Sequence, residues 1–477
     1  MAIKRKELIR EYTKAIRDGN AAVFGGAGLS RASGFVDWKN LLKPLAEDID
    51  LDIEKETDLL SVAQYYRNKR CSRYGINTAI IGAFSKAVEI NENVRILTRM
   101  PIYTYWTTNY DKLIEEGIKE ANRNPDVKSE SRQLSFTLYD RDAVVYKMHG
   151  DVSNPADTVL TKYDYEMYDQ KRPLFRTALK GDLISKTFLF IGFSFEDPNL
   201  DYILAQIHNL LGENIRDHYC FFKQVQREDY NSEAEYAYDK AKQSFREEDL
   251  RSYGIQTCFV DSYDEITDIL REIESAVKMR DVFISGSAHE FNGSWDKESA
   301  EKFARELASA LVKNNYRITS GYGVGIGSSI INGALDEIYS SKYKHIDEYL
   351  CLRPFPQNYT SEDEKERRNT QYREDMISNV GIAIFIFGNK ILSDSGATEI
   401  VNSDGCKKEF EIAVKNGKIV IPIGSTGYMA RELLDYIKEH FEDFIYLKNY
   451  IDDLYRETEV NKLVDLILKI IKNQQVI

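Results

Sequence analysis

Short apolar runs recur along the first half of the chain, and each ends in a polar or glycine-bearing loop. Such runs are typical of strands buried on both faces of a parallel sheet. The segments between most of them have helical periodicity, as in Glu7–Arg17 and Leu41–Ile49. This alternation predicts a doubly wound α/β domain. The runs are Ala21–Phe24, Pro101–Trp106, Val144–Met148, Thr187–Ile191, Tyr219–Phe222 and Thr257–Val260.

The same pattern begins again after a predicted helix at Glu265–Met279. The later runs are Val282–Ser285, Tyr316–Thr319, Tyr349–Leu352, Gly381–Phe387 and Lys418–Pro422. The fold class is therefore predicted as α/β, with two Rossmann-like parallel-sheet domains at residues 1–280 and 281–477. The charged stretch Arg227–Glu248 is expected to be a solvated pair of helices.

Composition limits the classes of function. A chain of 477 residues with 43% hydrophobic residues and a net charge of −13 is a folded protein without a general nucleic-acid surface. None of the five cysteines stands in a C-x-x-C pair, so no zinc ribbon and no other metal site is expected. We see no signal peptide, and no apolar run approaches the roughly 20 residues of a membrane-spanning helix, so a cytoplasmic location without membrane contact is expected.

Several loops at the predicted strand ends carry polar or small residues suited to chemistry. In an open parallel sheet, ligands bind at the carboxyl ends of the strands. Residues 25–30, Gly-Gly-Ala-Gly-Leu-Ser, open a predicted helix, where small residues let a pyrophosphate approach the backbone. A glycine after a strand is more often simply a tight turn. Asn109 and His149 end two further strands; alone, such residues usually cap a helix or sit satisfied in a core.

Taken together, these loops suit cleavage of the nicotinamide–ribose bond of NAD+. The reaction passes through an oxocarbenium-like state, and nicotinamide leaves without an acid. It requires a polar group that places a water or ribose hydroxyl, and a base that takes its proton. Asn109 suits the first role, and His149 suits the second because histidine titrates near neutrality.

The N-terminal motifs resemble those of the sirtuins. Residues 26–30, Gly-Ala-Gly-Leu-Ser, with residues 33–38, Ser-Gly-Phe-Val-Asp-Trp, are similar to the first sirtuin signature. Residues 107–111, Thr-Thr-Asn-Tyr-Asp, resemble the catalytic Asn/Asp motif, and His149-Gly150 resembles the catalytic histidine motif. Gly192-Phe193-Ser194 is similar to the loop that holds the adenosine ribose. The resemblance implies an NAD+ pocket formed by Gly26, Ala27, Gly28, Ser30, Asp37, Asp111, Gly192 and Ser194, with Asn109 and His149 as the catalytic residues.

The chain also departs from the sirtuin pattern. Sirtuin deacylases carry two C-x-x-C pairs after the histidine, whereas the segment between His149 and Gly192 contains no cysteine. The zinc-ribbon wall of the acyl-lysine cleft is therefore expected to be missing, which leaves water as the acceptor. Trp38 replaces a Phe of the family, Lys39 an Arg, and Thr108 a Gln.

Glycine-rich loops and a charged helix mark the second domain. Residues 321–327, Gly-Tyr-Gly-Val-Gly-Ile-Gly, do not form a G-x-G-x-x-G pattern, and a phosphate nest and a plain glycine turn both remain open. Asn369 and Arg373 share one face of a predicted helix, which is otherwise typical of a solvated charged helix. Another helix is predicted to begin at residue 404.

The second domain resembles the SLOG superfamily, whose enzymes cleave nucleoside monophosphates. Those enzymes carry P-G-G-x-G-T-x-x-E, whereas residues 403–409 are Ser-Asp-Gly-Cys-Lys-Lys-Glu, so binding is expected rather than hydrolysis. The two-domain combination resembles the SIR2–SLOG effector NADases of the bacterial Thoeris anti-phage defence. This resemblance implies a cyclic ADP-ribose isomer, made by a TIR-domain protein, as activator, and a homo-oligomer, a tetramer, as the assembly. It implies a signal site at Gly286, Ser287, Phe355, Arg373, Lys390, Gly405 and Glu409.

Three alternatives to a regulated NAD+ hydrolase remain open from the sequence. The first is a sirtuin-type protein deacylase, against which the missing cysteine pairs argue. The second is a non-catalytic sensor of NAD+ or ADP-ribose. In the third, the C-terminal domain is the enzyme and the N-terminal domain regulates it.

Overall fold

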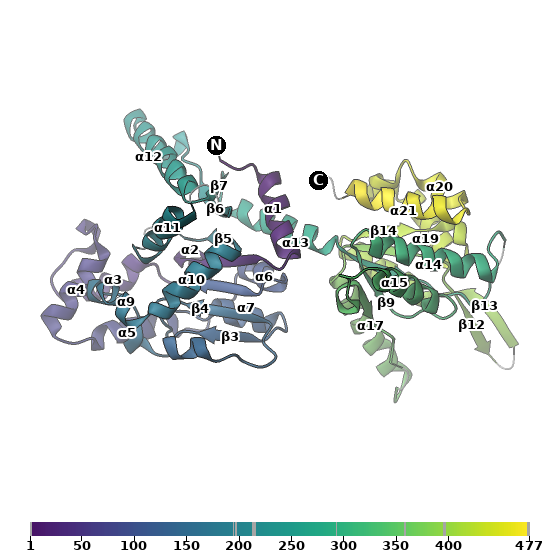
Figure 1. Ribbon diagram of the computed structural model, residues 1–477, viewed down its shortest axis with the longest axis horizontal. Helices are drawn as coiled ribbons and strands as arrows, with labels where there is room; N and C mark the ends of the chain where they lie inside the picture. The colour runs from purple at the N-terminus through teal and green to yellow at the C-terminus, as the bar shows by residue number, and fades with distance from the viewer. Residues whose placement is uncertain are drawn as a thin grey trace. The chain divides into compact units, whose positions relative to one another are not determined.

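The computed structural model describes residues 2–193, 195, 198–211, 216–291, 293–356, 359–394 and 397–474. The chain divides into two compact units, Met1–Glu274 and Ser275–Ile477 (Figure 1). Helix α13, Asp264–Lys278, spans the division.

The first unit has a parallel sheet of seven strands within the described residues, in the order β3-β4-β2-β1-β5-β6-β7. Its strands are β1 Ala21–Gly25, β2 Thr104–Thr107, β3 Pro125–Lys128, β4 Ala143–Lys147, β5 Thr187–Ile191, β6 His218–Lys223 and β7 Ile255–Val260. All six predicted strands are present. Every residue of β1 and β5 is buried, as expected for central strands whose apolar runs do not alternate.

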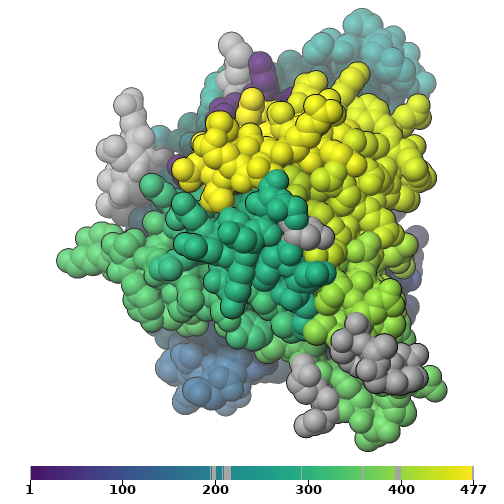
Figure 2. All heavy atoms as spheres, turned by 90° about the vertical axis from the view of Figure 1, so that its right-hand side faces the viewer, coloured from purple at the N-terminus to yellow at the C-terminus, as the bar shows by residue number. Residues whose placement is uncertain are grey.

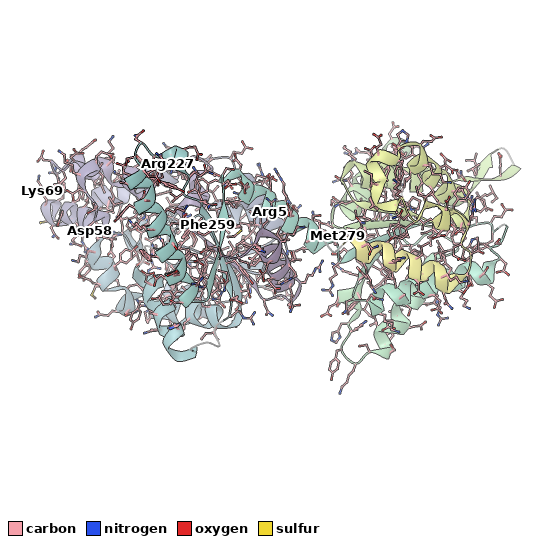
Figure 3. All side chains as sticks on the ribbon, turned by 90° about the horizontal axis from the view of Figure 1, so that it is seen from above. Arg5, Asp58, Lys69, Arg227, Phe259 and Met279 are labelled. Atoms are coloured by element: carbon pink, nitrogen blue, oxygen red, sulfur yellow. The ribbon has the colours of Figure 1, made fainter. Side chains whose placement is uncertain are left out.

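Helices connect these strands. They are α1 Arg5–Arg17, α2 Ala27–Arg31, α3 Trp38–Glu47, α4 Leu59–Arg70, α5 Tyr74–Phe84, α6 Glu92–Arg99, α7 Leu113–Glu120, α8 Lys162–Glu166, α9 Tyr168–Lys171, α10 Pro173–Ser185, α11 Pro198–Leu211, α12 Glu233–Ser252 and α13. Helices α3, α4 and α5 pack around an apolar cluster that includes Leu42, Val62 and Ile80. Helix α1 carries Arg5, which is labelled in Figure 3. Arg5 forms an ion pair with Glu272 of α13.

One expectation about this unit was wrong, and one strand was not predicted. The charged stretch from Arg227 forms one long helix, α12, after a single 3-10 turn at Arg227–Asp229, rather than a pair of helices. Strand β3 was missed because its sequence, Pro-Asp-Val-Lys, contains no apolar run. Its Asp126 and Lys128 are buried at the sheet edge and pair with each other at 2.8 Å.

The second unit has a five-stranded parallel sheet within the described residues, in the order β10-β9-β8-β11-β14. Its strands are β8 Asp281–Ser285, β9 Arg317–Ser320, β10 Leu350–Leu352, β11 Ile382–Phe385 and β14 Ile419–Pro422, which match the five predicted runs. The helices are α14 Lys297–Lys313, α15 Gly327–Ser340, α16 Ile346–Tyr349, α17 Glu362–Ser378, α18 Asp404–Lys415, α19 Tyr428–Glu439, α20 Ile451–Arg456 and α21 Val460–Gln474. Helix α21, yellow in Figure 2, lies against α14.

An antiparallel hairpin, β12 Asn389–Asp394 and β13 Ala397–Asn402, was not predicted. It exposes Ile391 and Leu392, so its residues do not form a run typical of a buried strand. Both large sheets are nevertheless parallel and flanked by helices, which confirms the predicted α/β class with two Rossmann-like sheets.

Candidate active site

A cleft of about 1140 Å³ lies at the carboxyl edge of the first sheet. Strand order changes direction between β1 and β5, and the loops after these two strands meet there. This is the place where open α/β sheets bind ligands. Of the predicted residues, Ala27, Gly28, Asp37, His149 and Gly192 line the cleft.

The glycine loop is held tightly against the loop after β5. A Cβ atom on Gly26 would lie 2.4 Å from the Gly192 carbonyl oxygen, and one on Gly28 would lie 2.8 Å from Gly192 Cα. The N–H groups of Gly26 and Gly28 donate to the carbonyls of Ile191 and Gly192, at 3.0 and 2.8 Å. These glycines therefore join two strand-end loops, and their N–H groups are used within the protein. Gly26 is the N-cap of helix α2, and Gly28 lies in the first turn of this five-residue helix.

Asn109 lies behind this loop in a network of side-chain hydrogen bonds. Its Nδ2 donates to the Gly26 carbonyl at 2.8 Å and to Ser30 Oγ at 2.7 Å. Ser30 Oγ in turn donates to Asp111 Oδ2 at 2.6 Å. Both amide hydrogens of Asn109 are thus accounted for, so the atom left to orient a water or hydroxyl is the carbonyl Oδ1. The network brings together Ser30, Asn109 and Asp111, which lie far apart in sequence.

His149 follows β4 and is 1% exposed. Its ring lies edge-on to Tyr165, with the centroids 5.4 Å apart, and to Tyr168 at 6.4 Å. Its carbonyl accepts from the Val159 N–H at 2.9 Å. Tyr168 Oη donates to the Met148 carbonyl at 3.2 Å, next to the histidine. Aromatic packing and backbone bonds thus hold the imidazole at the cleft wall.

Lys147, fully buried at the end of β4, joins the asparagine and histidine loops. Its Nζ donates to the carbonyls of Tyr110, at 3.2 Å, and Asp111, and pairs with Asp151 and with Glu115 Oε1 at 3.0 Å. Burial alone would lower the pKa of Lys147, but the carboxylates of Glu115 and Asp151 outweigh it and the pKa is raised. The ammonium therefore stays charged and holds both loops.

The other residues singled out from the sequence of this unit differ in whether they line the cleft. Asp37 caps α3, accepting from the Asn40 N–H at 2.8 Å. Trp38 and Thr108, two departures from the sirtuin pattern, line the cleft, whereas Lys39 pairs with Glu54 at 2.7 Å. Ser194 lies outside the described residues.

Sequence reasoning missed one wall of the cleft. The residues of this wall come from β6, α12 and the region around the start of α13. They are Phe221, Phe222, Lys223, Arg246, Tyr263 and Ile266. They belong to no short motif, and the sequence pattern predicted only the elements that carry some of them, such as the strand run at Tyr219–Phe222.

In the second unit, most of the predicted signal-site residues are linked by contacts around Glu409. This carboxylate, 7% exposed, accepts from Ser285 Oγ at 2.6 Å and pairs with Arg373 Nε at 3.4 Å. Burial raises the pKa of Glu409, against the effect of Ser285 and Arg373. The Arg373 guanidinium lies 4.9 Å from the centre of the Phe355 ring, and a Cβ on Gly405 would lie 3.1 Å from Arg373 Nη2.

The remaining predicted residues lie on the adjoining loops. Ser287 Oγ donates to the Asn389 carbonyl at 2.8 Å, which joins the ends of β8 and β11. Lys390 pairs with Asp404 at the start of α18. Gly286 approaches the Ile386 carbonyl so closely that a Cβ would lie 2.2 Å from its oxygen.

No helix in the described part of the chain is long and apolar enough to cross a bilayer. No group of three or more His, Cys, Asp or Glu residues within the described ranges is arranged to hold a metal ion.

Comparison with known proteins places both units in families. Residues 103–255 match the SIR2-like domain, and residues 265–474 match the Sir2- and TIR-associating SLOG family. The chain is 47% identical to the NAD(+) hydrolase ThsA of Cytobacillus dafuensis, over 94% of this chain and 92% of that protein. This chain belongs to the ThsA family. It is also 44% identical to the ThsA proteins of Bacillus cereus (strain MSX-D12), over 97% of each chain, and of Enterococcus faecium, over 99% of each.

The SIR2-like match lies within the first unit, and the SLOG match covers most of the second. The cleft described above lies entirely in the SIR2-like unit. In this chain, His149 and the glycine loops line that cleft, and Lys147 joins the asparagine and histidine loops behind it.

Proposed function

We propose that this protein hydrolyses NAD+ to nicotinamide and ADP-ribose in the cleft of its first unit. The observation that carries the proposal is full-length similarity to proteins named NAD(+) hydrolase, combined with a cleft in which His149 and the glycine loops meet. The proposed catalytic residues are Asn109 and His149. Gly26, Ala27, Gly28, Ser30, Asp37, Asp111, Gly192 and Ser194 are proposed to form the NAD+ pocket.

The chemistry follows from the positions of these groups. Asn109 Oδ1 accepts a hydrogen bond from the attacking water and so orients its oxygen toward C1′ of the nicotinamide ribose. As the C1′–N bond breaks, its electron pair leaves with nicotinamide and C1′ takes the water oxygen. His149 accepts the water proton. Tyr165 packs edge-on against both Trp38 and His149, and all three side chains line the cleft.

Regulation is the second part of the proposal. A cyclic ADP-ribose isomer made by a TIR-domain protein binds the second unit and switches the hydrolase on. NAD+ depletion would then act in anti-phage abortive defence, in a cytoplasmic homotetramer. On binding, Arg373 leaves its ion pair with Glu409 and binds a phosphate of the signal. Lys390 likewise leaves its ion pair with Asp404 and binds a phosphate. Gly286, Ser287, Phe355, Gly405 and Glu409 complete this proposed site. A ligand drives such a change only through its higher affinity for the active state.

The test is NAD+ turnover by the full chain, with and without candidate cyclic ADP-ribose isomers. Asn109→Ala and His149→Ala should each remove most of the turnover, while Tyr139→Ala, an exposed position, should keep it. Unchanged turnover in both site variants would refute the catalytic assignment. Absence of turnover by the parent chain under every condition would instead leave a sensor role. Turnover that requires an acetylated peptide, with transfer of the acyl group, would instead support a deacylase.

A further inference from the structure

The order of the strands sets an axis along the cleft. From β4 the order runs through β2, β1 and β5 to β6. Four steps of about 4.8 Å between neighbouring strands span roughly 19 Å. His149 follows β4 at one end, the glycine loop follows β1 in the middle, and Lys223 ends β6 at the other end. A dinucleotide whose nicotinamide ribose lies at His149 and whose pyrophosphate lies at the glycine loop therefore places its adenosine toward β6.

The adenosine end of the cleft carries positive charge. Lys223 and Arg246 both line it, with Phe221, Phe222, Tyr263 and Ile266. None of these described lining residues is a carboxylate. This end of the cleft therefore carries the opposite charge to the chain as a whole, whose net charge is −13.

The contacts of the two cations suit an exchange of partners. The Arg246 guanidinium lies 5.5 Å from the centre of the Phe222 ring, so the ring supports its orientation. Lys223 pairs with Asp229 at 3.2 Å, and both side chains of that pair are substantially exposed. An exposed pair of this kind contributes at most about 1 kcal/mol, so a phosphate group can displace Asp229.

The class of ligand follows from the chemistry of the adenosine ribose. Dinucleotide sites that prefer NAD+ commonly hold the 2′-hydroxyl with a carboxylate, while an arginine accommodates the 2′-phosphate of NADP+. We propose that NADP+ is a second substrate of this cleft, with its 2′-phosphate held by Lys223 and Arg246. This inference rests on the proposed NAD+ hydrolysis.

The reaction itself does not change. Water supplies its oxygen to C1′ of the nicotinamide ribose, and the electron pair of the C1′–N bond leaves with nicotinamide. The water proton passes to His149. The products are nicotinamide and the 2′-phosphate of ADP-ribose. The added phosphate lies at the far end of the cleft from the bond that breaks, so it affects binding and not the chemical step.

The test compares kcat/KM for NAD+ and NADP+ in the full chain under identical conditions, with and without candidate cyclic ADP-ribose isomers. NADP+ should be cleaved, and the K223A/R246A double variant should lower the ratio of NADP+ to NAD+ efficiency by about tenfold or more, as expected for lost charge-assisted bonds. Lys240→Ala is the matched control, because Lys240 also lies on α12 but stacks on Tyr236 instead of lining the cleft.

The outcomes separate the inference from the proposed function. Cleavage of NAD+ without cleavage of NADP+ overturns the inference alone, and so does a double variant that lowers both efficiencies equally. Cleavage of NADP+ without cleavage of NAD+ overturns the proposed function, and with it the description of NADP+ as a second substrate, but supports the 2′-phosphate site at Lys223 and Arg246. Failure to cleave either dinucleotide under every condition overturns both.

Discussion

The ammonium of Lys147 lies 3.0 Å from Glu115 Oε1 with no exposure to solvent. The same ammonium pairs with Asp151, two residues after His149, and donates to the carbonyls of Tyr110 and Asp111, beside Asn109. One buried charge thus connects the two loops proposed to carry out the chemistry. A buried charge with several partners is costly to remove, because its partners remain buried.

Lys147→Met should therefore destabilise the protein strongly. Removing one partner of a buried ionic group costs about 3–5 kcal/mol, here because Glu115 and Asp151 would keep buried charge without compensation. Denaturant unfolding would measure the change. Lys119→Met is the control, since Lys119 pairs with Glu116 at the surface and should cost at most about 1 kcal/mol. Equal effects of the two variants would contradict the role given to Lys147.

Acid should weaken the fold partly through Asp164. Burial raises the pKa of Asp164, but Arg73 at 2.7 Å and the bonds from Thr161 outweigh it, and the pKa lies below its usual value. A carboxyl group whose pKa is lower in the folded state stabilises the fold above its unfolded pKa of about 3.9. That stabilisation is lost as the pH falls through the lower, folded value.

The unfolding free energy should therefore decline below about pH 4, and Asp164→Asn should make that decline shallower while lowering stability at pH 7. Urea unfolding at a series of pH values measures both effects. Asp18→Asn, at an exposed helix end, is the control and should keep the parent slope. A parent-like slope in Asp164→Asn would rule out this contribution.

Gly28→Ala should disturb the cleft. The added Cβ would lie 2.8 Å from Gly192 Cα, and backbone on both sides must shift to accept it. We expect a loss of about 1–3 kcal/mol in stability, typical of overpacking, and a raised KM for NAD+. Gly82→Ala is the matched control: its Cβ would meet nothing within 4 Å on helix α5, so it should stabilise by about 0.5–1 kcal/mol. Thermal unfolding and NAD+ kinetics would distinguish the two.

Arg373→Ala should reduce the response to the signal nucleotide. The proposed site needs Arg373 for a phosphate, and in the structure this side chain already contacts Glu409 and Phe355. The ratio of stimulated to unstimulated NAD+ turnover should fall toward one. Arg305→Ala, which removes an exposed partner of Asp336, should keep the full ratio. A normal response in Arg373→Ala would place the signal elsewhere.

Much of the architecture was predictable from the sequence because it is encoded locally. An apolar run such as Val282–Ser285 is buried in any parallel sheet, so its residues alone predict a strand. Strand β3 and strands β12 and β13 escaped prediction because none has the apolar run of a buried strand. Strand β3 depends on its pairing with β4, and β12 and β13 pair with each other. The glycines of residues 26–28 were predictable as a turn, but their close contact with Gly192 depends on the pairing of β1 with β5.

The sequence by itself determined the α/β class, the two sheets and the positions of Asn109 and His149 at strand ends, because each depends on a short stretch of chain. The tertiary structure alone decided that Lys147 joins those two residues' loops and that Lys223 and Arg246 line the far end of the same cleft. These relationships depend on the strand order, which brings together segments far apart in the chain. Local sequence patterns do not specify that order, because the same buried runs are compatible with several arrangements of one sheet.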